Sequence, residues 1–264
     1  MIISMPSLSI GRPVNEVQLR YHWQRSSCLL PRASDECRQR ISQVDHESSL
    51  ISQNSSSSST LTLRNVLELV HSDVWGPAKT ASMGGCRFYV TFIDDRTRKV
   101  WVYFMKEKSE VFTHFQNFKA MAEKQTKKYV QCLRSDGGGE YFSNEFSSFL
   151  KKHGIQRQFT RRYTPQQNGV VEQKNRHIAE VARVLMTEKN VPHCYWAEAM
   201  STAVYIMNRT PTAAVHNVTP EEKFSGKKLD LGHLKVFGCI AYVHVPDELR
   251  TKLDPKAEKC IFIG

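Results

Sequence analysis

Three acidic residues combine side-chain types and sequence neighbours that suit metal-assisted phosphodiester chemistry. Asp73 stands late in a β-rich apolar run, Asp136 ends another such run directly before three glycines, and Glu172 stands at the start of a long amphipathic segment. Hard divalent cations prefer carboxylate oxygens, and two such ions assist attack on a phosphodiester when several acidic groups converge within about 4 Å. We therefore take these three residues as candidate metal ligands.

Each acid taken alone also has an ordinary structural explanation. Asp73 could end a strand, Asp136 could belong to a glycine turn, and Glu172 could be favoured by the helix dipole. The spacing is more informative, since 35 residues separate Asp136 from Glu172. Convergence requires that the strands before Asp73 and Asp136 are neighbours and that the helix of Glu172 packs at their ends.

Strand-like and helix-like segments alternate along the chain from about residue 61. Apolar β-rich runs predict strands at 67–75, 86–94, 99–106, 129–136 and 155–160. Helical spacing and capping residues predict helices at 109–124, 143–154, 170–189 and 195–208. This order predicts an α/β fold in which helices flank a mixed five-stranded sheet.

The composition divides the chain into three parts. Residues 1–60 have no sustained periodicity and end in a polar tract, Ser48–Thr60, so we expect a disordered segment with a Ser-rich linker. Residues 61–212 form the expected catalytic core. Residues 213–264 contain two apolar runs, the second of which stops at the last residue, so we expect a truncated C-terminal extension.

The net charge is +11 and the pI is near 9.4, which favours polyanionic partners. Residues 1–60 contribute +1, so residues 61–264 carry +10. The seven cysteines are scattered without a CxxC pair, as expected for a reduced intracellular compartment. No run of about 18 apolar residues exists, so the sequence predicts no membrane span. The opening MIISMPSLSI is short and broken by Pro6, so no clear targeting signal is predicted.

Five sequence strings together resemble the integrase of a copia-type LTR retrotransposon over about residues 66–264. They are LELVHSDVWGP (67–77), FIDDRTRKVWVYFMKEKSE (92–110), LRSDGGGEY (133–141), TPQQNGVVEQKNR (164–176) and VFGCIAYVHVP (236–246). The resemblance implies a ribonuclease-H-like fold with a D,D-35-E catalytic triad. The matching positions in this chain are Asp73, Asp136 and Glu172.

The resemblance also implies a function, cofactors and partners. Family members process the 3′ ends of the element's DNA and join them to host DNA, using two Mg²⁺ (or Mn²⁺) ions. We therefore expect double-stranded DNA, both element ends and target, as the substrate. A homo-multimer and a nuclear location are expected from the same function.

Several polar residues near Glu172 are candidates for binding DNA. On a regular helix Arg176 and Arg183 point about 40° and 20° away from Glu172, so both should lie on the catalytic side. A flexible loop at 161–169 should precede the helix, and its expected DNA contacts are Arg161, Arg162, Gln167 and Asn168. A solvated basic face and an ordinary flexible connection are the alternatives.

Three departures from the family pattern bear on activity. Residues His22, Cys28, Cys37 and His46 do not have the order of the family's N-terminal zinc module. Gln173 stands where Arg is common, and Gly137 where Asn is usual. The protease and reverse transcriptase of the parent polyprotein are also missing from the sequence.

Two alternative functions therefore remain open beside the metal-dependent transferase. One is a catalytically silent nucleic-acid-binding remnant of a degenerate element. The other is a ribonuclease specific for RNA–DNA hybrids, which would use a fourth acid. Asp94 and Asp95 are the obvious candidates for that acid, although acids are also common in an exposed turn between two strands.

Overall fold

A computed structural model describes residues 2–3, 65–159 and 165–264; for residues 2–3 and 165–168 it describes the backbone only. The predicted N-terminal segment, apart from residues 2–3, lies outside the described residues, as do Arg161 and Arg162. The residues considered for a zinc module, at positions 22 to 46, also lie outside them. The fold below is that of the described part of the chain.

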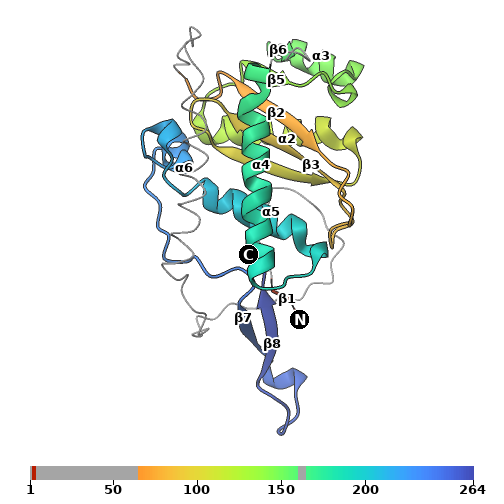
Figure 1. Ribbon diagram of the computed structural model, residues 1–264, viewed down its shortest axis with the longest axis vertical. Coiled ribbons are helices and arrows are strands. Elements are labelled where there is room, and N and C mark those ends of the chain that lie inside the picture. Colours follow the sequence, from red (N-terminus) through yellow and green to blue (C-terminus); the bar gives the residue numbers. More distant parts are fainter. Residues whose placement is uncertain (1, 4–64, 160–164) are drawn as a thin grey trace.

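The centre of the fold is a mixed five-stranded sheet in the order β4-β3-β2-β5-β6 (Figure 1). Strands β2, β3 and β4 are antiparallel, whereas β2, β5 and β6 are parallel. The strands are β2 (Val70–Trp75), β3 (Phe88–Asp94), β4 (Val100–Met105), β5 (Cys132–Ser135) and β6 (Gln156–Phe159). The prediction of a mixed five-stranded sheet flanked by helices is confirmed.

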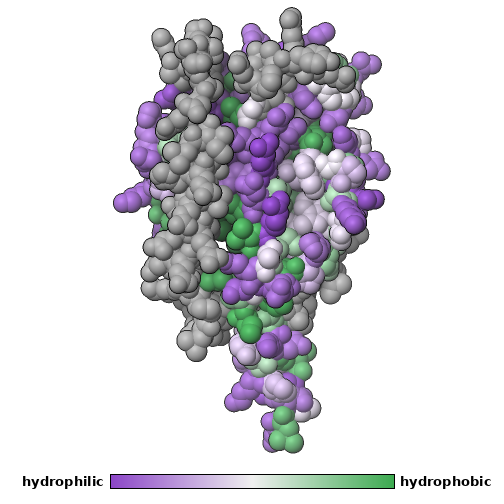
Figure 2. Space-filling view, in the orientation of Figure 1, coloured by the Kyte–Doolittle hydropathy of each residue, from purple (hydrophilic) through white to green (hydrophobic). Residues whose placement is uncertain are grey.

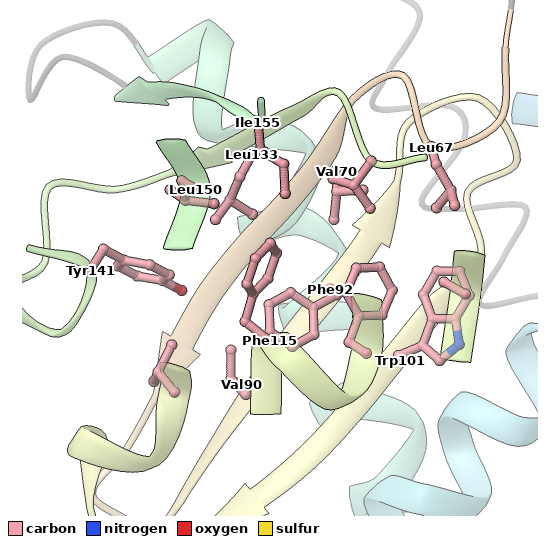
Figure 3. Packing of buried hydrophobic residues seen from close by; sticks show 14 of the residues in the cluster. Leu67, Val70, Val90, Phe92, Trp101, Phe115, Leu133, Tyr141, Leu150 and Ile155 are labelled. Carbon is pink, nitrogen blue, oxygen red and sulfur yellow. The ribbon is translucent and has the colours of Figure 1, made fainter. Parts of the chain in front are cut away.

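One face of the sheet is covered by helices α2 (Val111–Thr126) and α3 (Asn144–Lys152). Residues at helical spacing along α2 bury apolar side chains against the strands, and the sheet contributes Phe92, which stacks on Phe118 with ring centroids 4.7 Å apart. Figure 3 shows this layer around Phe92 and Phe115. Ser143 caps the start of α3, and its Oγ accepts a hydrogen bond from the Phe146 amide.

The opposite face is covered by α4 (Pro165–Glu188) and α5 (Trp196–Met207), and α4 runs along the front of the sheet in Figure 1. Alternation along β3 divides the two layers, because Val90 and Phe92 belong to the α2 side while Tyr89 and Ile93 pack in the cluster formed with α4 and α5. The α4 face therefore has its own apolar core, on which the site is built.

Helix α4 begins at Pro165, five residues before the predicted start near 170. Proline suits the first turn of a helix because its φ is already helical and its missing N–H would have no intrahelical partner. The prediction of a loop over residues 161–169 is therefore wrong for its second half. Gln167 and Asn168 lie in the first turn of α4.

The C-terminal residues pack onto the core before they form a separate hairpin. Helix α6 (Pro220–Ser225) places Phe224 against Trp101, with ring centroids 4.9 Å apart. Strands β7 (Ile240–His244) and β8 (Ala257–Phe262) then form a hairpin at one end of the molecule, joined by the two-residue β1 (Ile2–Ile3) (Figure 1).

Five short 3₁₀ helices connect these elements in the described ranges. They are η2 (Lys108–Glu110), η3 (Gly139–Tyr141), η4 (His193–Tyr195), η5 (Ala213–Val215) and η6 (Asp247–Leu249). None of the helices among the described residues has the length and apolar content that crossing a membrane requires.

Candidate active site

Parallel pairing of β2 with β5 brings the first two acids to the same edge of the sheet. The register pairs Ser72 with Ser135, so the next residues, Asp73 inside β2 and Asp136 directly after β5, lie where the pairing of these two strands ends. The neighbouring strands that convergence required are therefore present. Both acids follow residues of the α2 side, so alternation directs their side chains toward α4.

Asn175 of α4 connects the helix to this edge. Its Nδ2 donates a hydrogen bond to Asp73 Oδ2 at 2.7 Å, and its Oδ1 accepts one from Thr91 Oγ1 at 3.0 Å. The amide is buried between the helix and the sheet, where both of its polar ends are used. This bridge fixes the position of Asp73 relative to the helix that carries Glu172.

The charges of the three acids affect the pKa values of Asp73 and Asp136. Burial is the main cause that raises the pKa of Asp73 to about 6, and the charges of Asp136 and Glu172 raise it further, against the hydrogen bond from Asn175. Burial also raises the pKa of Asp136, and the charge of Glu172 contributes to that rise. The acids repel one another, which is the arrangement that a bound cation would relieve.

The described residues contain no three His, Cys, Asp or Glu side chains gathered closely enough to hold a metal ion as they stand. Glu172 is exposed on α4, while Asp73 and Asp136 are more enclosed at the sheet edge. The site is therefore open to solvent on the side of Glu172.

The chemistry of these residues fits a hard divalent cation. Asp136 Oδ1 is buried and has no hydrogen-bond partner among the described residues, so a carboxylate oxygen at the site is left unsatisfied. Carboxylate oxygens are the preferred ligands of Mg²⁺ and Mn²⁺. The raised pKa values point the same way, because a cation would stabilise the ionised forms.

The segment after Asp136 adds a second acid and a cation. The Gly138 amide donates a hydrogen bond to Asp136, whose pKa is raised by the charge of Glu140 and lowered by that of Lys108. Lys108 Nζ lies 3.9 Å from Glu140 Oε1. Gly137 has open space around the position of a β-carbon, so the Asn usual in the family would fit there.

Asp94 and Asp95 have structural partners away from these acids. Asp94 is fully buried and accepts hydrogen bonds from the Leu67 amide and from both the amide and hydroxyl of Thr97. Asp95 binds His71 Nε2 at 2.9 Å and Arg98 at 3.1 Å. Burial opposes ionisation of Asp95, but these contacts lower its pKa overall.

The candidate DNA-binding residues on α4 lie on its exposed side. Glu172, Arg176 and Arg183 are exposed, whereas Val171 and Ile178 of the same helix are buried. Figure 2 shows hydrophilic residues along the middle of this face, where α4 runs in Figure 1. Gln167 and Asn168 lie at the beginning of this helix, and their side chains are not described. A DNA-binding role for all these residues stays a prediction.

Two features of the site were not singled out from the sequence. Asn175 was missed because an amide in a helix interior usually has no special role, although its position three residues after Glu172 places it near the same edge. The second is the pair Trp75 and Tyr89. The Tyr89 hydroxyl is buried without a hydrogen-bond partner among the described residues, and burial, together with the charge of Asp73, raises its pKa.

Fold and site together define a ribonuclease-H-like domain with acids where two neighbouring parallel strands stop pairing and on the helix packed across them. Comparison with protein families agrees, because residues 64–165 match the integrase core domain and residues 239–264 match the retroviral polymerase SH3-like domain.

Curated relatives give closer matches. The chain is 48% identical over 200 residues to the retrovirus-related Pol polyprotein from transposon TNT 1-94 of Nicotiana tabacum, covering 76% of this chain and 15% of that protein. It is 38% identical over 208 residues to the Pol polyprotein from transposon RE2 of Arabidopsis thaliana, covering 79% and 14%. The chain thus spans about one seventh of the length of these relatives.

Among solved structures, the chain resembles a chain of the simian T-cell lymphotropic virus intasome in complex with the PP2A regulatory subunit B56 gamma. The TM-score is 0.50 at 16% identity, covering 72% of this chain and 66% of that chain, which supports the fold. The chain thus contains an integrase core domain and is a homologue of Pol polyproteins from copia-type plant retrotransposons.

Proposed function

We propose that the chain acts in DNA integration as a metal-dependent polynucleotidyl transferase that processes 3′ ends and transfers strands. The observation that carries the proposal is the position of Asp73 and Asp136 where β2 and β5 stop pairing, beside the helix that bears Glu172. The match to the integrase core domain supports the same chemistry.

Asp73, Asp136 and Glu172 are the residues that would hold two Mg²⁺ or Mn²⁺ ions. When bound, such ions activate the attacking oxygen and stabilise the charge on the leaving 3′-oxygen. No protein nucleophile is required.

The remaining residues of the site hold the acids in position and are proposed to bind DNA. Asn175 keeps Asp73 fixed against α4, and the Gly138 amide holds Asp136. Arg176 and Arg183, exposed on the side of Glu172, are proposed to contact phosphates on either side of the scissile bond, together with Arg161, Arg162, Gln167 and Asn168. The proposed substrate is double-stranded DNA at element ends and at the target, bound by a homo-multimer in the nucleus.

The test uses the whole 264-residue chain, supercoiled plasmid and short DNA duplexes with Mn²⁺ or Mg²⁺. We expect nicking of the plasmid or joining of duplex ends that depends on the metal ion. Asp136→Asn should reduce either reaction to the level seen without metal. The matched control is Asp230→Asn, which makes the same acid-to-amide change at an exposed residue in another part of the chain and should retain activity.

The outcomes separate the functions that the sequence left open. DNA binding without cutting or joining of any DNA would overturn the transferase and leave a silent nucleic-acid-binding remnant. Cleavage confined to an RNA–DNA hybrid would identify a ribonuclease instead. The internal partners of Asp94 and Asp95 argue against that outcome, because neither acid is available as the fourth acid of such an enzyme.

A further inference from the structure

An exposed tryptophan lies beside the first acid of the site. Trp75 ends β2 and is 43% exposed, although large aromatic side chains are usually mostly buried. Residues two apart in a strand point to the same face, so Trp75 shares the α4 side with Asp73 at a separation of about 7 Å. A large flat surface is therefore available next to the place where a phosphodiester would react.

Two aromatic side chains, Tyr89 and Trp196, hold the Trp75 ring in place. It stacks on Tyr89 of β3, with ring centroids 5.1 Å apart and an interplanar angle of 21°. Trp196 lies 6.1 Å away at a tilt of 56°, and its own Nε1 donates to the Thr80 carbonyl at 3.0 Å. The exposed ring is thus supported by the buried Tyr89 and the partly buried Trp196, and its orientation is fixed before any ligand binds.

The backbone leaves the sheet immediately after this ring. Gly76 has a φ of +128°, and a β-carbon there would lie 2.7 Å from the Arg87 carbonyl oxygen, so only glycine fits. The stretch from residue 74 to 93 contains Lys79 and Arg87 and no acidic residue. Asp73 precedes Trp75, and the segment that follows Trp75 carries a net positive charge, which favours a polyanion.

We propose that Trp75 stacks an unpaired nucleobase next to the reacting phosphate, and this inference rests on the proposed function. Aromatic side chains bind single-stranded nucleotides of any sequence, because every base has a flat face. Along one strand, successive nucleotides of a duplex are about 3.4 Å apart, so a base one or two nucleotides from a phosphate at Asp73 reaches Trp75. The bases at a frayed DNA end are the natural ligands, since they leave their partners most easily.

A second copy of the protein is the other possible occupant of an exposed tryptophan. The cations Lys79 and Arg87 favour a nucleic acid, because two copies of the same positively charged segment would repel each other. The closeness of Trp75 to Asp73 favours the same ligand.

The test measures binding in EDTA, so cleavage does not interfere. The probes are a blunt DNA duplex and the same duplex with a three-nucleotide unpaired tail containing 2-aminopurine, whose fluorescence falls when it stacks. The full chain should bind the tailed duplex more tightly and quench the probe. Trp75→Ala should weaken tailed-duplex binding about tenfold without changing blunt-duplex binding. Trp75→Phe should keep most of the affinity, because a smaller aromatic ring remains.

The matched control is Tyr129→Ala, which removes an exposed aromatic side chain just before β5, at the opposite end of that strand from Asp136. It should bind both probes like the unchanged chain. If Trp75→Ala does not fold, Trp75→Phe still tests whether Trp75 stacks on the base. The unlabelled tailed duplex should quench the tryptophan fluorescence of this variant less than that of the unchanged chain.

Each contrary outcome overturns the inference in a recognisable way. Equal effects of Trp75→Ala on both probes, or none on either, would show that this ring does not stack an unpaired base. A change in sedimentation mass without a change in probe quenching would identify a protein interface instead. Failure of the unchanged chain to bind either DNA would overturn the proposed function and, with it, the stacking role.

Discussion

Asp73 occupies a position where its own negative charge is unfavourable. Its pKa is raised to about 6, mainly by burial and then by the charge of Asp136, although Asn175 donates a hydrogen bond to it. A structural carboxylate would be expected beside a cation or in water, as Asp95 is beside Arg98. An acid kept in a costly environment by a buried amide is typical of a site organised for binding rather than for stability.

We predict that Asp73→Asn stabilises the metal-free chain against unfolding. The folded-state pKa lies above the ordinary value of 3.8, so Asp73 favours folding below about pH 4, and this contribution is lost as the pH rises through 6. The asparagine variant avoids that loss and should be more stable by about 2–3 kcal/mol at pH 7.5, but by only about 1 kcal/mol at pH 4.5. Urea unfolding in EDTA at the two pH values measures both differences.

Added Mn²⁺ should reverse the order of the two proteins. A ligand that binds only the folded state raises its stability, so the unchanged chain should gain and Asp73→Asn should gain much less. Asp230→Asn, an exposed acid in another part of the chain, should respond to Mn²⁺ like the unchanged chain. Equal stability of Asp73→Asn and the unchanged chain in EDTA would show that the charge of Asp73 does not destabilise the metal-free fold.

At the scale of elements, the sequence predicted the types of the main strands and helices better than their contacts. Alternating apolar residues predicted β3, and helical spacing of Phe115 and Phe118 predicted α2. Side-chain periodicity does not determine which strands pair, so the adjacency of β2 and β5 was only a condition for convergence until the structure showed it. The early start of α4 at Pro165 was missed because the Gln, Asn and Gly residues that follow this proline are typical of loops.

A buried ion pair joins α6 to the edge strand β4. Lys99 Nζ lies 2.8 Å from Glu221 Oε1, and it also lies over the rings of Trp101 and Phe224, at 5.1 and 4.3 Å from their centroids. Burial lowers the pKa of Lys99, while Glu221 opposes that shift. Glu221 therefore helps to keep the buried Lys99 charged.

We predict that Glu221→Gln destabilises the chain by about 3 kcal/mol, because it leaves the buried Lys99 ammonium without its counter-charge. The double variant Lys99→Met with Glu221→Met should recover most of that loss, since two apolar side chains need no compensation. Urea unfolding at pH 7.5 measures all three proteins. The control Asp247→Asn, which removes the charge of an exposed acid paired with Arg250, should cost less than about 1 kcal/mol. A Glu221→Gln cost as small as that of the control would show that α6 is not held through this pair.

For the whole molecule, composition predicted the sign of the charge but not its distribution. The +10 of residues 61–264 could cover any surface, and only the structure shows Arg176 and Arg183 exposed on the helix of Glu172. Trp75 was likewise part of a recognised strand, but its exposure depends on the exit of the chain at Gly76 and on the support from Tyr89. Long-range packing, which no local pattern contains, decided both features.

The salt dependence of DNA binding tests this distribution of charge. Each phosphate contact releases counterions, so log K should fall linearly with log salt, by about 0.9 per contact. The double variant Arg176→Ala with Arg183→Ala should reduce the slope by about 1.8 if both side chains contact phosphates. Lys151→Ala with Lys152→Ala removes the same charge from the exposed end of α3 and should leave the slope nearly unchanged. Titrations of a blunt duplex in EDTA between 50 and 200 mM salt give the three slopes. Equal reductions in both double variants would mean that the whole basic surface attracts DNA without orientation, and that α4 does not direct DNA toward Asp73 and Asp136.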